Sequence, residues 1–147
     1  LHLTFLQILV GALVAGIDAG RNYVDWPLMA GGFLPPYPFE LSPWWRNFFE
    51  DDGLVQFMHR MIGYTLFLFC LFAWRRSRSS GNSTLKFSFN VILAIAIFQM
   101  VLGIATVMYA APWEIAIIHQ FGAILLWIFV IRARFVTKYP PSTIITS

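Results

Sequence analysis

The sequence has little charge: 12% of its 147 residues are Asp, Glu, Lys or Arg, whereas 59% are hydrophobic and 18% are aromatic. A soluble domain of ordinary composition carries about 25% charged residues. The low charge excludes such a domain, because so much apolar side chain could not be covered in water. The composition indicates an integral membrane protein.

Cysteine and histidine are also scarce. Cys70 is the single cysteine, which excludes a disulfide within this sequence, and we expect it to be a buried structural thiol. There are three histidines and no HExxH or comparable motif. A zinc or copper site needs more ligands than this, so neither metal is expected.

Long apolar runs make up most of the chain, at residues 3–20, 54–74, 88–110 and 114–131. A bilayer core about 30 Å thick is crossed by about 20 apolar residues in a helix. The runs do not alternate apolar and polar residues as barrel strands do, so the spans must be helices. The predicted fold class is all-α, an integral membrane four-helix bundle.

Charge is distributed unequally around these runs. The acids lie in or beside the segments after the first and third runs: Asp18, Asp25, Glu40, Glu50, Asp51, Asp52 and Glu114. Basic residues follow the second and fourth runs: Arg75, Arg76, Arg78, Lys86, Arg132, Arg134 and Lys138. By the positive-inside rule, the basic ends lie in the cytoplasm or the mitochondrial matrix and the loop 21–53 is external. The net charge of +3 is therefore a topology signal, and nucleic acid is not an expected partner.

The external loop is too long for a plain connector and contains five prolines. Ser42 before Pro43 is a typical helix start, with Ser as N-cap, so the stretch WWRNFF is predicted to form a short helix in the membrane interface. Its aromatic side chains suit the headgroup level. Two interpretations stay open, an aromatic belt and a lid over an outward-facing pocket.

Two histidines occupy equivalent places in two of the predicted spans. His59 and His119 are each the sixth residue of a helix that runs from outside to inside, so we expect their rings at equal depth in the outer third of the membrane. This arrangement fits two axial ligands of one haem iron. A proton relay, another metal site or a quinone pocket would also use such a pair. His2, at the inner end of the first run, is assigned no role.

Small residues accompany the histidines. Gly63 follows His59 by one turn, and Gly122 and Ala123 follow His119 by one turn, so a flat macrocycle could lie against these faces. Gly16 and Gly103 lie within a turn or two of the same level. The alternative is that these glycines are only helix-packing contacts.

Arg60 is the charged residue beside His59. It is predicted to bind a haem propionate, and the alternative is an ion pair with Asp51 or Asp52.

At these positions the chain resembles the haem A synthase family. The similar segments are LVAGIDAGRNYVDWPLMAGGF, SPWWRNFFEDDGLVQFMHRMIGY and FQMVLGIATVMYAAPWEIAIIHQFGA, and the resemblance covers nearly all 147 residues. It implies eight spans in two four-helix halves, each half with a histidine pair, and this chain resembles the C-terminal half. The sequence starts at Leu1 without Met, so we expect further sequence before it.

The resemblance implies a haem b cofactor in this half, with His59 of QFMHR and His119 of IIHQ as its iron ligands. In the other half, which accepts the substrate haem, Glu stands three residues before the first histidine. Gln56 occupies that place here, which favours the cofactor half and implies no catalytic residue in this segment. The cysteine pair in the outer loops of some relatives is absent.

The implied activity is an oxidoreductase that converts the methyl group of haem O to the formyl group of haem A for terminal oxidases. Electron transfer is the favoured role for this half, because two histidines fill both axial positions. The implied partners are haem O through the other half, the lipid membrane, haem O synthase and a second copy of the chain. The expected location is a bacterial inner membrane, with the mitochondrial inner membrane as alternative. Two other functions stay open, a free-standing cytochrome b-type electron carrier and a transporter with a histidine relay.

Overall fold

The computed structural model describes residues 1–139, which are helical apart from the connecting loops. The elements are α1 (His2–Gly16), a short 3-10 helix (Ala19–Arg21), a second one (Trp44–Arg46), α2 (Asn47–Glu50), α3 (Asp52–Ser77), α4 (Ser83–Met108) and α5 (Trp113–Lys138). The predicted all-α class is confirmed.

Three helices, α3, α4 and α5, are long and apolar enough to cross a membrane, each with 26 residues. The helix α1 is apolar but has only 15 residues. It stops short of the predicted end at residue 20, because Asp18 takes a left-handed conformation with a φ of 55° and the chain continues as a 3-10 helix. The structure thus gives three helices of spanning length and one shorter apolar helix within residues 1–139.

Side chains at the helix starts explain where the long helices begin. The carboxylate of Asp51 accepts a hydrogen bond from the backbone N–H of Leu54, which caps α3. The side chain of Asn82 does the same for Leu85 at the start of α4. Each cap satisfies an N–H group that has no partner within its helix.

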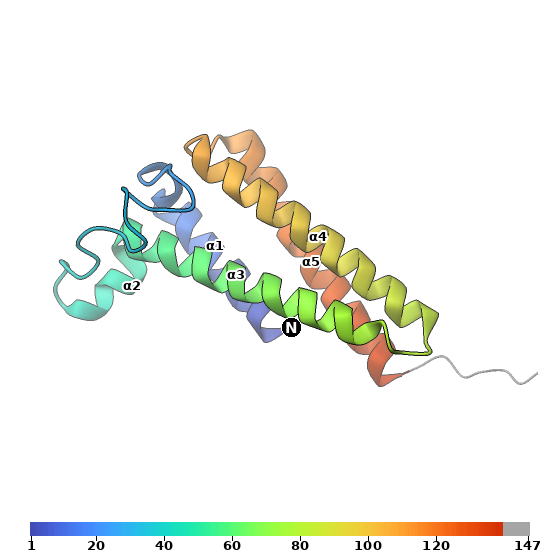
Figure 1. Ribbon diagram of the computed structural model, residues 1–147. Helices are drawn as coiled ribbons and strands as arrows, with labels where there is room; N and C mark the ends of the chain where they lie inside the picture. The colour runs from blue at the N-terminus through green and yellow to red at the C-terminus, as the bar shows by residue number, and fades with distance from the viewer. Residues whose placement is uncertain (140–147) are drawn as a thin grey trace, which may run out of the picture.

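The helices pack so that each has two neighbours: α1 lies against α3 and α5, and α4 lies against α3 and α5 (Figure 1). The long loop and α2 sit at one end, opposite the turn that joins α3 to α4. The buried apolar cluster joins α3, α4 and α5 and consists of Leu66, Cys70, Ile92, Ala96, Leu126 and Ala133. The expectation that Cys70 is a buried thiol is confirmed.

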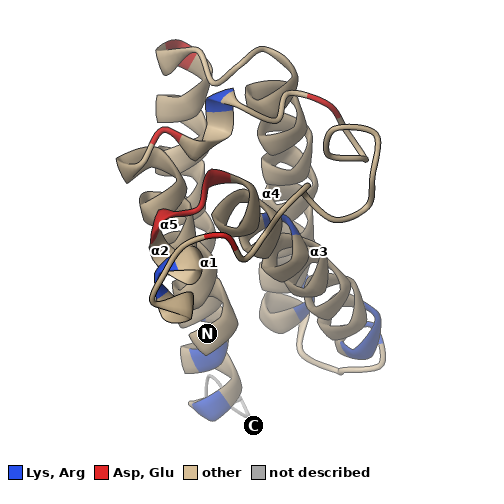
Figure 2. Cartoon of the chain, turned by 90° about the vertical axis from the view of Figure 1, so that its left-hand side faces the viewer, with Lys and Arg blue, Asp and Glu red and all other residues tan. Residues whose placement is uncertain are grey.

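The two ends of the molecule differ in charge. Figure 2 shows the acidic residues around the end that carries the long loop, and most of the basic residues at the end where α3 and α5 finish. The loop 21–53 predicted to be external lies at the acidic end.

The external loop contains the predicted interfacial helix in a modified form. It begins at Trp44 rather than at Pro43, and no side chain caps it, so the prediction of Ser42 as N-cap is wrong. Asn47, which is fully buried, orders the segment instead: its amide donates to the carbonyls of Leu41 and Trp44 and accepts from the N–H of Leu41. Trp44 is 69% exposed, as expected for an aromatic residue at a membrane interface.

Candidate functional site

The structure brings His59 of α3 and His119 of α5 together. Their ring centroids are 6.4 Å apart and the ring planes are nearly perpendicular, at 85°. Both rings are partly buried between the helices. The structure thus brings together two candidate ligands that are 60 positions apart in sequence.

The distance between the ring centroids can be compared with the distance expected for two imidazoles that bind one metal ion. A bond from an imidazole nitrogen to a metal ion is about 2 Å long. Two such bonds, together with the distance from each nitrogen to its ring centre, fit a centroid separation of 6.4 Å. The Nδ1 atom of His119 is buried without a hydrogen-bond partner. The donor set and its spacing fit a haem iron, whose ligands at both axial positions can be imidazoles.

Glutamine side chains flank the histidines, which the sequence analysis did not foresee. The amide nitrogen of Gln7, on α1, lies 3.2 Å from both ring nitrogens of His59. Gly11, one turn along α1, gives the ring its space: a Cβ atom there would lie 2.8 Å from the Cε1 atom of His59. Any larger residue at position 11 would displace the ring.

The second histidine has an equivalent setting. A Cβ atom on Gly103, in α4, would lie 3.2 Å from the Cε1 atom of His119. Gln99, one turn before Gly103, is 8% exposed, and both polar atoms of its amide lack a partner. We call Gln7 with Gly11, and Gln99 with Gly103, the two Gln–Gly pairs.

The glycines that follow the histidines face these glutamines. A Cβ atom on Gly63 would lie 3.1 Å from the amide nitrogen of Gln7, and one on Gly122 would lie 2.0 Å from that of Gln99. The faces expected to receive a flat macrocycle are thus in contact with side chains in this structure. Gly16 has no atom within 4 Å of its Cβ position, so it makes no close helix contact among the described residues.

A repeated sequence motif could have revealed the glutamines. The segments QILVG at 7–11 and QMVLG at 99–103 share glutamine and glycine at the same spacing. A polar amide inside an apolar span is costly unless it has a partner, so such residues mark functional positions. Neither Gln7 nor Gln99 was among the expected site residues.

Arg60 binds the external loop. Its guanidinium donates to the backbone carbonyls of Leu28, Tyr23 and Asp25, at 3.0 to 3.1 Å. It also donates to the side-chain oxygen of Gln56. The side chain is buried, with 9% exposed, and its Nε atom has no partner.

The alternative partners considered for Arg60 are engaged elsewhere. Asp51 caps α3, and Asp52 accepts from Asn22. The ion pair of Arg60 with either acid is therefore a wrong prediction, because the guanidinium points into the loop. Gln56 is likewise an anchor of the loop, since its amide donates to the carbonyl of Tyr23 at 3.2 Å.

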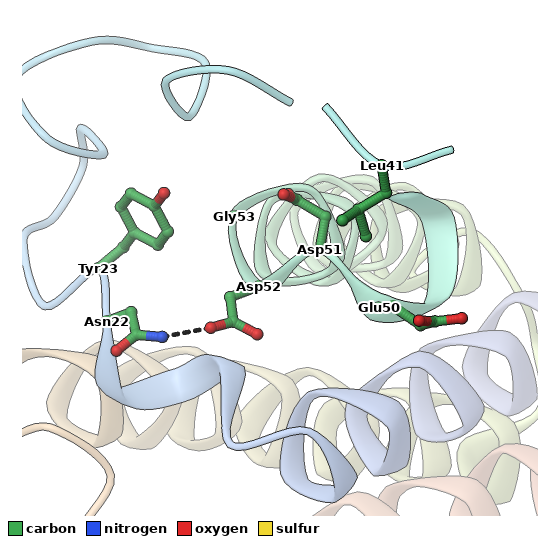
Figure 3. A pocket seen from close by; sticks show the side chains of 7 residues that line it. All are labelled: Asn22, Tyr23, Leu41, Glu50, Asp51, Asp52 and Gly53. Carbon is green, nitrogen blue, oxygen red and sulfur yellow. Dashed lines mark hydrogen bonds between the residues drawn. The ribbon is translucent and has the colours of Figure 1, made fainter. Parts of the chain in front are cut away.

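An open pocket of about 450 Å³ lies at the outer end of α3 (Figure 3). Its lining residues are Asn22, Tyr23, Leu41, Glu50, Asp51, Asp52 and Gly53. Partial burial, together with the charges of Asp51 and Asp52, raises the pKa of Tyr23 above its ordinary value. Within residues 1–139 no group of three or more His, Cys, Asp or Glu side chains could hold a metal ion.

A second, apolar pocket of about 570 Å³ lies at the inner end, between α1, α3, α4 and α5. His2 is among its lining residues, far along α1 from the Gln7 contact with His59. His2 is thus separate from the histidine pair.

Comparisons with known proteins bear on the histidine site. The family described as cytochrome oxidase assembly protein matches residues 1–131. A protein of Ruegeria pomeroyi named "Heme A synthase" is 59% identical over 143 residues, which are 97% of this chain and 38% of that protein. Proteins of the same name from Dinoroseobacter shibae and Paracoccus denitrificans are 60% and 44% identical, over 96% and 97% of this chain and 37% and 38% of their own length. No solved structure matches the chain. The chain spans well under half the length of these relatives.

Proposed function

The chain belongs to the cytochrome oxidase assembly protein family, and from this premise we propose that it is the C-terminal half of a haem A synthase. The high identity to three bacterial proteins of that name supports the family part of the proposal. The assignment to the C-terminal half rests on the resemblance of the motifs and on Gln56. The name of these relatives supports an oxidoreductase activity for the complete protein. Its proposed reaction is the oxidation of a methyl group of haem O to the formyl group of haem A.

This half would hold haem b through His59 and His119. The observation that carries the proposal is the 6.4 Å separation of the two partly buried rings, which arise from different helices. When bound, such a haem supplies one-electron chemistry. The protein contributes the two imidazoles and the apolar helices that exclude water around them.

The proposed role of the site is electron transfer rather than oxidation of the substrate. His59 and His119 would both serve as ligands of the haem, which would then supply electron transfer and would leave no ligand site for an oxidant. The substrate haem O would bind in the other half. Gln56 supports this assignment, because its amide is bound to Tyr23 and Arg60 and it offers no carboxylate.

The proposed role of Arg60 is twofold. Its terminal nitrogens hold the external loop, and its buried Nε atom, which has no protein partner, is available to a haem propionate. A charge-assisted hydrogen bond of this kind is stronger than a neutral one.

We further propose four spans, formed by α1, α3, α4 and α5, in a four-helix bundle that is one half of an eight-span protein of the bacterial inner membrane. The ring of contacts among the four helices supports this arrangement. With 15 residues, α1 is about 22 Å long. The 3-10 helix that follows α1 packs against α3 and extends the polypeptide towards the outer surface.

A reduced-minus-oxidised spectrum of purified membranes tests the haem proposal. Expression of the natural gene product should give a low-spin b-type spectrum that is lost or changed in His59→Ala and in His119→Ala. An unchanged spectrum in either variant would contradict the ligand assignment. A transporter with a histidine relay would show no haem band, whereas a free-standing electron carrier would show the band without any haem A formed from haem O.

A further inference from the structure

The two Gln–Gly pairs repeat one contact pattern. In the α1 and α3 pair, His59 faces Gly11, and Gln7 faces Gly63. In the α4 and α5 pair, His119 faces Gly103, and Gln99 faces Gly122. The two helices in each case are antiparallel. The glutamine lies one turn inward of the glycine on its own helix, and the histidine lies one turn outward of the glycine on the other helix.

The repeat extends to unsatisfied polar atoms. The side-chain oxygen of Gln7, both amide atoms of Gln99 and the Nδ1 atom of His119 are buried without partners. Leaving a buried polar group unpaired costs about 1–3 kcal/mol. The unpaired atoms lie on the histidine or on glutamines of the two Gln–Gly pairs. We infer that they form hydrogen bonds when each imidazole ring carries its proton on one particular nitrogen.

A histidine that ligates a metal has this property. Such a ring binds the metal through one nitrogen and donates its other N–H to a carbonyl, carboxylate or water, which fixes the ring orientation and raises the basicity of the ligand. The amide nitrogen of Gln7 already lies 3.2 Å from the Nδ1 atom of His59, and equally far from its Nε2 atom. A 180° flip of the side-chain amide exchanges its oxygen and nitrogen. The oxygen can then accept a hydrogen bond from an Nδ1–H group of the histidine.

We propose that Gln7 and Gln99 are positioning residues for the two histidines, each accepting the Nδ1–H of one ring through its amide oxygen. The inference rests on the proposed haem site. It accounts for the unpaired oxygens of both glutamines and for the unpaired Nδ1 of His119. Gly11 and Gly103 give each ring the space to approach its glutamine-bearing helix.

The test is the midpoint potential of the haem that depends on His59, measured in the natural gene product. Gln7→Leu and Gln99→Leu remove the acceptor, whereas Gln7→Glu and Gln99→Glu retain one. The hydrogen bond makes the imidazole a stronger donor and stabilises the oxidised iron. Each Leu variant should therefore shift the potential in the positive direction, and each Glu variant should return it to the unaltered value or below.

Gln120→Leu is the matched control, because Gln120 is an exposed glutamine in the same membrane helix as His119. Its potential should equal that of the unaltered protein. Electron paramagnetic resonance of the low-spin haem should report altered ligand orientation in the Gln7 and Gln99 variants and no change in the control.

The outcomes separate this inference from the proposed function. A haem that requires His59 and His119 but keeps its potential in both Leu variants overturns the positioning role and leaves the proposed function intact. Absence of haem from the unaltered protein overturns both. If a Leu variant loses its haem, the Glu variant at that position decides: haem retained at or below the unaltered potential supports the role, and loss in both variants overturns it.

Discussion

His59 and His119 lie with their ring centroids 6.4 Å apart and their planes at 85°. Each ring packs against a glycine of a neighbouring helix, Gly11 for His59 and Gly103 for His119. The distance between the rings is therefore set by two helix pairs rather than by a direct contact of α3 with α5.

Replacement of these glycines should damage the site selectively. In Gly11→Ala the added methyl group would lie 2.8 Å from the His59 ring, closer than carbon atoms can approach. We expect a large loss of bound haem, measured by the pyridine haemochrome assay, while the protein still inserts. Gly16→Ala is the control, because no atom lies within 4 Å of its Cβ position. Equal haem content in both variants would contradict the prediction.

The charge separation predicts the orientation of the chain. Reporter fusions at Ser80, in the basic turn between α3 and α4, and at Gly32, in the external loop, should report opposite sides of the membrane. Ser80 should face the cytoplasm. The same side for both fusions would be incompatible with α3 crossing the membrane.

Arg60 should be essential for the order of the external loop. Arg60→Met removes the donor from the carbonyls of Asp25 and Leu28, and leaves the carbonyl of Tyr23 with the amide of Gln56 alone. A hydrogen bond from a charged group contributes about 1.5–3 kcal/mol. Limited proteolysis should cut the loop faster in this variant, and the thermal midpoint should fall. Arg46→Met removes an exposed pair with Glu50 and one exposed hydrogen bond to the carbonyl of Ser42, and should change both readouts little. A loop equally resistant in both variants would refute the anchoring role.

The loop should also loosen in acid through Asp25. Burial acts to raise the pKa of Asp25, but hydrogen bonds from the N–H groups of Ala30 and Gly31 and the charge of Arg60 outweigh it, so the pKa lies below its ordinary value of 3.8. A lowered folded-state pKa contributes stability above the unfolded-state pKa, and this contribution disappears as the pH falls through the folded-state value.

Proteolysis of the loop as a function of pH measures this effect. The unaltered protein should become more sensitive as the pH falls below about 4, whereas Asp25→Asn should show a smaller change over the same range. The exposed Asp18→Asn serves as the control and should follow the unaltered protein. An identical acid response in Asp25→Asn would assign the loosening to other groups.

The role of this half can be tested by expressing residues 1–147 alone with a source of haem O. We expect haem b in the extracted pigment and no haem A, since Gln56 supplies no carboxylate and the proposed ligands His59 and His119 would leave the iron no free position. Gln56→Glu should not create activity. Accumulation of haem A in a host without its own synthase would show that the roles of the two halves are reversed.

Sequence alone determined the class of this protein and the identity of its paired histidines. Apolar runs of spanning length force helices, since backbone groups in lipid must be satisfied within the segment. Equal offsets of His59 and His119 in two parallel helices then place the rings at one level. Burial of Cys70 also followed from its place in an apolar run.

The tertiary structure decided which side chains surround that pair. Gln7 reaches His59, and Gln99 reaches Gly122 one turn from His119, only because α1 packs on α3 and α4 packs on α5, with glycines allowing the close approach. Arg60 binds the loop rather than Asp51 or Asp52, because three carbonyls some 30 residues earlier fold over it. Such contacts depend on helix rotation and loop path, which local sequence patterns do not specify.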